Sequence, residues 1–250
     1  MIDTHAHLYL LNQPLAATLT KAKQANVQHI INIGIDIDSS IKALNQAKKY
    51  PTFISATLGI HPCECLNFTD YTQLKNLAIS KPFVAIGEIG LDYHHMTAPK
   101  KTQWDCFIKQ LALAQDLDLP VVIHNRKADD DIASIINDFP KVKKVLHCFS
   151  SSISFAESVL NDTTFFSFTA TITFAKKGKT LTALKQLPLH HIMIETDCPY
   201  LKPKDCDTSE NEPALVDHVL TKMAAVRSMD KSVLETQLDQ TSRDFFNLKR

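Results

Sequence analysis

The chain has 250 residues, of which 27 are Lys or Arg and 27 are Asp or Glu, so its formal net charge is zero. Hydrophobic residues make up 44% and charged residues 22%, which is typical of a folded globular protein and excludes a disordered, collagen-like or disulfide-scaffold chain. The balanced charge argues against a protein held on DNA or on a membrane by overall basicity, but it leaves room for a small, locally positive site. The length fits one domain spanning residues 1–250, because α/β barrels commonly contain about 200–250 residues.

The start of the chain carries no export signal. Residues 1–7 contain neither a basic segment nor a long apolar one, and no later stretch approaches the roughly 18 apolar residues of a membrane span. We therefore expect a cytoplasmic protein with no membrane contact and with six reduced cysteines, and no obligate protein partner is evident. Cys63 and Cys65 form a CxC pair rather than CxxC, so their spacing does not favour a cysteine-based zinc site.

Short apolar runs alternate with longer stretches of helical periodicity. Eight apolar runs are predicted to be strands, ending near His5, Gly34, Ile60, Glu88, His124, His147, Phe168 and Glu195. A helix is predicted over residues 98–117, and two more, near residues 213–229 and 231–246, follow the last strand. This pattern predicts an α/β fold, a (β/α)8 TIM barrel with extra C-terminal helices. An open doubly wound sheet is the alternative, disfavoured because no GxGxxG or phosphate loop follows the first strand.

Side chains of the metal-ligand type gather at the carboxyl ends of these strands. His5 and His7 lie two residues apart on the first strand and so point to the same side. Four further strand ends carry a His or a carboxylate, namely Glu88, His124, His147 and Asp197. Each has an ordinary explanation alone, since an HxH pair is more often a surface or core feature and Asp197 could cap a turn. Together they predict a metal site, because a barrel brings these strand ends to one mouth, where burying them unpaired would be costly.

Six motifs in a fixed order carry a resemblance to a known family. They are Asp3-Thr4-His5-Ala6-His7, Gly59-Ile60-His61-Pro62, Gly87-Glu88-Ile89-Gly90-Leu91-Asp92-Tyr93, Ile123-His124-Asn125-Arg126, His147-Cys148-Phe149-Ser150 and Glu195-Thr196-Asp197-Cys198-Pro199-Tyr200-Leu201. From Asp3 to about Pro213 the sequence resembles the TatD-type metal-dependent hydrolases of the amidohydrolase superfamily, many of which are deoxyribonucleases. The resemblance implies a hydrolase that acts on ester bonds.

The resemblance also implies two divalent ions per chain. By position, the expected ligands are His5, His7 and Asp197 for one ion, His124 and His147 for the other, and Glu88 as the bridge. The chemistry agrees, because two cations about 3.5–4 Å apart need a bridging anion, which a carboxylate supplies and an imidazole does not. Mixed nitrogen and oxygen ligands suit Zn²⁺, Mn²⁺ or Ni²⁺ better than Mg²⁺, and the sequence leaves the identity open among these four.

Metal-assisted hydrolysis is the mechanism expected at this centre. A water between the ions would lose a proton, since zinc can lower the pKa of bound water to about 7, and the hydroxide would attack a phosphorus atom. Asp197 would accept the proton, and Glu88 would hold both ions. The leading hypothesis is a two-metal phosphodiesterase that takes DNA as its substrate and acts from a strand end as an exonuclease. The alternative is a hydrolase of a small ester, amide or phosphoester; a barrel that binds metal or nucleic acid without turnover is less favoured, because the ligands are intact.

Residues in the neighbouring loops are expected to bind substrate. Arg126 suits bidentate contact with a phosphate, and Lys202 provides a point charge in the loop after the eighth strand. His61 and Tyr93 would stack on or hydrogen-bond a nucleotide, with a purely structural role as the equal alternative. The lysines of residues 176–179 are expected to be solvated.

Two positions depart from the family pattern. Ser151 stands where Gly usually follows the His-Cys-Phe-Ser motif, and Glu210 stands where an Arg usually precedes Asn-Glu-Pro. The segment 211–213 is expected to start the next helix and to brace the loop after the eighth strand. A carboxylate in place of a cation would weaken phosphate binding or shift substrate preference. His94 and His95 are expected to be surface or supporting residues.

Overall fold

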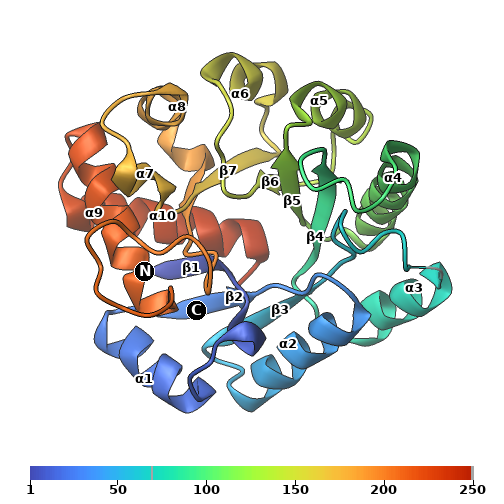
Figure 1. Cartoon of the computed structure of the whole chain (residues 1–250), viewed down its shortest axis with the longest axis horizontal. Helices are drawn as coiled ribbons and strands as arrows, with labels where there is room; N and C mark the ends of the chain where they lie inside the picture. The colour runs from blue at the N-terminus through green and yellow to red at the C-terminus, as the bar shows by residue number, and fades with distance from the viewer. Residues whose placement is uncertain (69, 249–250) are drawn as a thin grey trace.

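The computed structural model describes residues 1–68 and 70–248, and in these residues eight parallel strands form one sheet in sequence order (Figure 1). The strands are β1 (Ile2–Ala6), β2 (His29–Asn32), β3 (Ile54–Leu58), β4 (Ala85–Asp92), β5 (Val121–Arg126), β6 (Lys144–Leu146), β7 (Thr164–Phe168) and β8 (Ile192–Ile194). Each pairs in parallel with the next, and helices surround the sheet in Figure 1. The predicted (β/α)8 barrel is therefore confirmed.

Helices connect the strands and extend the C-terminus. They are α1 (Leu15–Gln24), α2 (Ile37–Lys49), α3 (Tyr71–Ser80), α4 (Lys100–Leu117), α5 (Asp129–Asn137), α6 (Ile153–Val159), α7 (Thr171–Phe174), α8 (Lys179–Gln186), α9 (Val216–Arg227) and α10 (Lys231–Phe246). Short 3₁₀ helices lie at η1 (Leu8–Leu10), η2 (Leu189–His191) and η3 (Pro213–Leu215). The two C-terminal helices are present as predicted, except that the first begins as η3 and continues as α9.

The ring closes between β1 and the segment that follows β8. Ala6 forms an isolated parallel bridge with Cys198. The His7 amide donates to the Cys198 carbonyl and the Asp197 amide to the His5 carbonyl, both at 2.8 Å. These contacts set Asp197 beside the two histidines of β1, although the chain between them runs through the whole barrel.

The amino-terminal end of the barrel is covered by α10. Phe245 and Phe246 share a buried cluster with apolar side chains of five strands, among them Val122 and Met193. The Ile2 amide donates to Asp239 Oδ1 at 2.9 Å, which holds α10 at the start of β1. With this end closed by a packed core, the carboxyl ends of the strands are left to carry the polar groups.

The elements end one or two residues from several of the expected boundaries. β2 ends at Asn32 and β3 at Leu58, two residues earlier than the apolar runs suggested, because the regular strand pairing ends before the apolar residues do. α4 starts at Lys100 because Pro99, at φ −56° and ψ 147°, precedes its first turn.

Among the described residues, no helix combines the length and the apolar character needed to cross a membrane. All six cysteines are free.

Candidate metal centre

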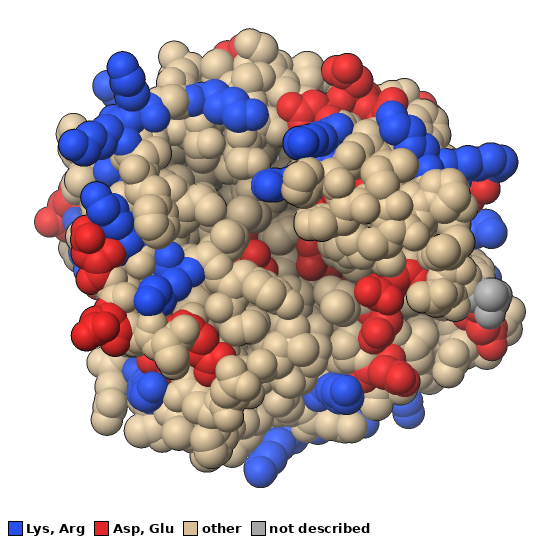
Figure 2. Space-filling model, in the orientation of Figure 1, with Lys and Arg blue, Asp and Glu red and all other residues tan. Residues whose placement is uncertain are grey.

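The six predicted ligands converge at the carboxyl end of the barrel. His5 lies in β1, Glu88 in β4 and His124 in β5, while His7, His147 and Asp197 directly follow strands or lie a few residues beyond them. Figure 2 shows a central hollow on this face, with acidic surface at its floor and Lys and Arg around its rim. The sequence prediction that these side chains share one mouth is therefore met by the geometry.

The donor atoms of four of the six side chains enclose a space that fits a tetrahedrally coordinated ion. His5 Nε2 lies 3.3 Å from His7 Nε2, 3.4 Å from Glu88 Oε2 and 3.6 Å from Asp197 Oδ1. His7 Nε2 lies 3.5 Å from Asp197 Oδ1 and 3.8 Å from Glu88 Oε2. A tetrahedral ion with bonds of about 2.0–2.2 Å needs ligand atoms about 3.3–3.6 Å apart, so these donors fit an ion of zinc size.

The other oxygen of Glu88 faces a second group of nitrogens. Glu88 Oε1 lies 2.8 Å from His147 Nε2, 3.0 Å from His124 Nδ1 and 3.6 Å from His61 Nε2. His147 Nε2 and His124 Nδ1 are 3.5 Å apart. Each carboxylate oxygen of Glu88 thus serves one of two adjoining nitrogen clusters, which is the arrangement that a carboxylate bridging two cations requires.

Two of the imidazoles are oriented by hydrogen bonds to groups behind them, and a third, His147, faces a carboxylate there without a hydrogen bond. His7 Nδ1 donates to the carbonyl oxygen of Ile33 at 3.0 Å. His124 Nε2 lies 3.0 Å from Asp92 Oδ2, and His147 Nδ1 lies 3.4 Å from Glu195 Oε1. A ligand histidine normally donates its second ring nitrogen in this way, which fixes its tautomer and raises its basicity.

Asp92 and Glu195 lie against the predicted ligands His124 and His147, and the sequence reasoning did not single them out, although both stand inside quoted motifs. Asp92 lies four residues after Glu88 in β4, and Glu195 lies two residues before Asp197. Since side chains on one face of a strand recur every two residues, the alternation that paired His5 with His7 could have found Asp92 in β4. Glu195 follows the end of β8, where this alternation does not apply.

The electrostatic potential of the centre favours the binding of cations. Burial alone would raise the pKa of Glu88, but the facing imidazoles of His147 and His61 hold that pKa well below its ordinary value. Burial likewise opposes ionisation of Asp197, yet a hydrogen bond from His7 lowers its pKa. Burial would lower the pKa of His147, and the Glu88 charge instead raises it well above normal. Two buried ionised carboxylates therefore face one space, which positive charge must balance.

The close approach of β4 to β5 depends on Gly90. Its φ is +137°, and a Cβ placed there would lie 2.1 Å from the carbonyl oxygen of His124. Only glycine fits such a contact in that conformation. The approach matters for the centre because β4 carries Glu88 and β5 carries His124.

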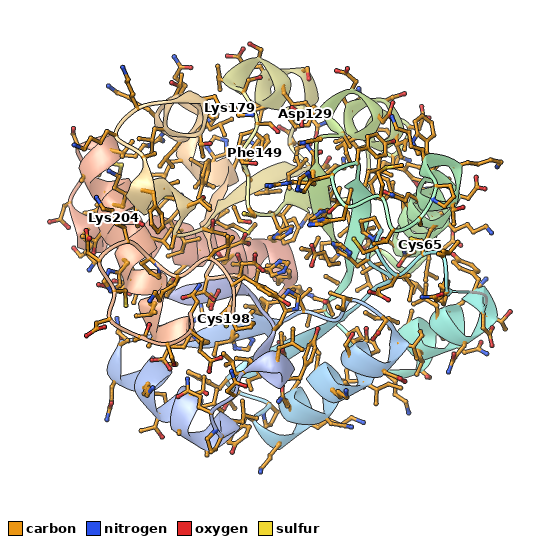
Figure 3. The ribbon with its side chains drawn as sticks, in the orientation of Figure 1. Cys65, Asp129, Phe149, Lys179, Cys198 and Lys204 are labelled. Atoms are coloured by element: carbon orange, nitrogen blue, oxygen red, sulfur yellow. The ribbon has the colours of Figure 1, made fainter. Side chains whose placement is uncertain are left out.

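A cavity of about 680 Å³ lies between the loops that follow β5 and β6; Asn125, next to His124 in β5, lines it, whereas none of the six predicted ligands does. Its lining includes Tyr93, Arg126, Ser151 and Lys179, together with the first turn of α5. In Figure 3 the labelled Asp129 and Lys179 lie near each other at this part of the rim. Lys179, which was expected to be merely solvated, thus faces the cavity together with Arg126.

The expected substrate residues fall into three places. Arg126 lines the cavity, whereas His61 faces Glu88, and burial lowers the pKa of His61 to about 3. The Tyr93 hydroxyl donates to Asp131 Oδ2 and accepts from an indole N–H, both at 2.6 Å, so its hydroxyl is already committed. Lys202 Nζ donates to a carbonyl of its own loop at 2.7 Å, and Lys202 does not line this cavity.

Each departure from the family pattern makes a defined contact. Ser151 Oγ donates to Asp129 Oδ1 at 2.7 Å, and Asn125 Nδ2 donates to the same oxygen at 2.8 Å, so Asp129 ties the loop after β6 to the end of β5. Glu210 accepts from the backbone amide and the side-chain amide of Asn12, which joins the loop after β8 to the loop after β1.

The segment 211–213 braces the loop after β8 as expected. Asn211 Nδ2 donates to the carbonyl oxygens of Thr196 and Tyr200, at 2.8 and 2.6 Å. Lys21 Nζ donates to Glu212 from α1 at 3.0 Å. Pro213 then opens η3, from which α9 continues.

Comparisons with a family model, with related sequences and with solved structures all point to the same family. The model of the family described as TatD related DNase matches residues 2–247. The chain is 32% identical to the uncharacterized metal-dependent hydrolase YabD of Bacillus subtilis, over 99% of both chains. It is 34% identical to the 3'-5' ssDNA/RNA exonuclease TatD of Erwinia tasmaniensis, over 92% of both. The crystal structure of YjjV, a TatD homologue from Escherichia coli, superposes with a TM-score of 0.91 at 28% identity and covers 100% of this chain and 98% of its own.

Proposed function

The chain belongs to the TatD-related DNase family and is a metal-dependent hydrolase, and from that premise we propose that it removes nucleotides from an end of single-stranded DNA or RNA. The observation that carries the proposal is the division of the centre by Glu88, with one oxygen toward each nitrogen cluster. The Erwinia tasmaniensis relative, named a 3'-5' exonuclease of single-stranded DNA and RNA, supports both the substrate and a 3'-5' polarity.

Two divalent ions per chain are part of the proposal. His5, His7 and Asp197 would hold one, and His124 and His147 the other, with Glu88 shared. Bound ions would polarise the phosphoryl group and lower the pKa of water. Mixed nitrogen and oxygen donors favour Zn²⁺, Mn²⁺ or Ni²⁺ over Mg²⁺.

Asp197 is the residue proposed to accept a proton from the attacking water. Its side chain is 13% exposed, against 4% for Glu88, so it is the ligand carboxylate that a water can approach from the mouth. Its Oδ1 faces His5 and His7. The second oxygen is thereby available to take a proton, while the imidazoles hold the carboxylate in place.

The substrate strand is proposed to run across the cavity beside the centre. Arg126 would hold a backbone phosphate through two parallel N–H donors, and Lys179 would add a second positive charge on the same rim. Lys202 is assigned a weaker part, because its ammonium already braces the loop after β8. The zero net charge of the chain then limits non-specific duplex binding without weakening this local contact.

The test uses end-labelled single-stranded DNA, single-stranded RNA and duplex DNA, each with Mn²⁺, Zn²⁺, Ni²⁺ or Mg²⁺. A ladder that shortens the single strands from the 3' end, and that is lost in Asp197→Asn, is expected. Asp138→Asn is the matched control, since Asp138 is exposed at the C-terminal end of α5 and does not line the cavity. Intact nucleic acid with every metal, while a small phosphoester or carboxylic ester is cleaved, would overturn the proposed substrate.

A further inference from the structure

A third group of metal-ligand side chains lies beside the six-residue centre and forms no part of it. Cys63 follows β3, Asp92 ends β4 and His95 lies three residues beyond, and their donor atoms all lie within 4.8 Å of one another. The loop that carries Cys63 lies on the same side as the labelled Cys65 in Figure 3, near α3 and α4. The group therefore combines one thiol, one carboxylate and one imidazole from two adjacent loops.

Hydrogen bonds hold these two loops together. Asp92 is 1% exposed, and its Oδ1 accepts from the backbone amides of His94 and His95, both at 2.8 Å. Thr97 Oγ1 donates to the carbonyl oxygen of Cys63 at 2.9 Å, which links the loop after β4 to the loop after β3. A fixed carboxylate and a tethered cysteine backbone give the group the preorganisation that a binding site needs.

The CxC spacing was a poor guide to this group. Cys65 Sγ donates to the carbonyl oxygen of His61 and is buried, so it does not join Cys63. The partners of Cys63 come instead from the end of the next strand. Asp92 Oδ2 lies 2.7 Å from His95 Nδ1, and since the His95 side chain is 60% exposed, its ring is free to move the roughly 0.6–0.9 Å that an ion between them requires.

We propose that Cys63, Asp92 and His95 form an accessory site for a divalent cation of the zinc type, separate from the two ions of the proposed nuclease centre. Sulfur, nitrogen and oxygen ligands together select Zn²⁺ and its soft analogues Co²⁺ and Cd²⁺, and they disfavour Mg²⁺. Three protein ligands leave one coordination position open to water, unlike the four protein ligands of a structural zinc site.

The accessory site is coupled to the centre through one oxygen atom. Asp92 Oδ2 is both the contact of His95 and the partner of His124 Nε2, at 3.0 Å. An ion that takes up this oxygen weakens the hydrogen bond that orients His124. Occupancy of the accessory site is therefore expected to inhibit the hydrolase. This consequence rests on the proposed function, whereas binding itself does not.

Cobalt binding tests the site without any assay of activity. None of the six centre ligands is a sulfur, so a thiolate-to-Co²⁺ charge-transfer absorption reports a cysteine ligand alone. The wild-type protein, titrated with Co²⁺ after its centre has been filled, is expected to show the band. Cys63→Ser should lose it and Cys65→Ser should keep it. Absence of the band, its survival in Cys63→Ser or its loss in a folded Cys65→Ser would overturn the proposal.

A zinc titration of hydrolysis tests the coupling. Excess Zn²⁺ is expected to inhibit the wild type at concentrations at least about tenfold lower than it inhibits Cys63→Ser, because one of three ligands is missing in the variant. His95→Ala should shift in the same direction. Equal inhibition of wild type and both variants would refute the coupling. A protein that shows the cobalt band but cleaves no nucleic acid would instead refute the proposed function and leave the accessory site standing.

Discussion

Replacing Asp92 by Asn should put the ring proton of His124 on the wrong nitrogen. Asp92 Oδ1 accepts two backbone amides, and Oδ2 faces His124 Nε2 at 3.0 Å and His95 Nδ1 at 2.7 Å. In Asp92→Asn, the amide oxygen keeps the backbone contacts, so the NH₂ group turns toward His124. Nε2 must then accept, which places the proton on Nδ1, the nitrogen that lies 3.0 Å from Glu88 Oε1.

The expected size of this effect follows from the role of the oxygen. Loss of a group that orients a ligand histidine typically lowers metal affinity or activity 10–100-fold, or about 1.4–2.8 kcal/mol. The loss of metal affinity should affect the ion held by His124 and His147. The ion held by His5 and His7 should keep its affinity, because neither of those imidazoles contacts Asp92.

Metal competition against a calibrated chelator measures both affinities. The variant is best made in a Cys63→Ser background, so that the accessory site does not contribute, and Asp131→Asn in the same background is the matched control. One ion weakened 10–100-fold and one unchanged is the expected result. Two wild-type affinities in Asp92→Asn, or equal loss of both ions from a folded protein, would refute the role given to Asp92.

Three further outcomes are expected. Ala at Gly90 should destabilise the fold by about 1–3 kcal/mol more than Ala at Gly178 in thermal unfolding, because both have φ above +130° but only at Gly90 does a backbone oxygen occupy the Cβ position. Burial lowers the pKa of His29 to about 4, so the unfolded chain binds more protons below about pH 6.5 and stability falls as the pH drops toward 4. The free energy of unfolding, measured with denaturant, should therefore fall by about 2 kcal/mol less in His29→Gln than in wild type between pH 7 and about 5. Parallel pH curves for the two proteins would contradict the burial of a neutral imidazole. Arg126→Ala should raise KM for single-stranded DNA roughly 10–100-fold at nearly constant kcat. Lys202→Ala should raise KM much less, since the Lys202 ammonium is already engaged in a hydrogen bond. A larger rise of KM in Lys202→Ala would assign the phosphate contact to Lys202 instead.

The order of the barrel could be predicted because each strand is buried on both faces and reads as an apolar run between helical stretches. The strand ends could not be placed to the residue, since buried apolar positions such as Ile33 and Ile60 continue past the last residue of the strand. Closure of the ring depends on backbone contacts between His7 and Cys198, which no local pattern encodes.

The convergence of the six proposed ligands could be predicted because their positions at strand ends follow from the topology of the barrel. The ring nitrogen that each histidine turns toward the centre could not be predicted. His124 presents Nδ1 and His147 presents Nε2, because each ring has different surroundings behind it. The accessory group could not be predicted from the sequence for a different reason. Cys63 finds its partners across two loops, and spacing along the chain carries no information about that approach.

Anomalous scattering from crystals of the protein grown with Mn²⁺ tests the bridging role of Glu88 most directly. Two peaks are predicted, about 3.5–4 Å apart, one within bonding distance of Glu88 Oε2 and the two histidines of β1, and the other of Glu88 Oε1, His124 Nδ1 and His147 Nε2. A single peak, or two peaks of which only one contacts Glu88, would contradict the two-metal centre.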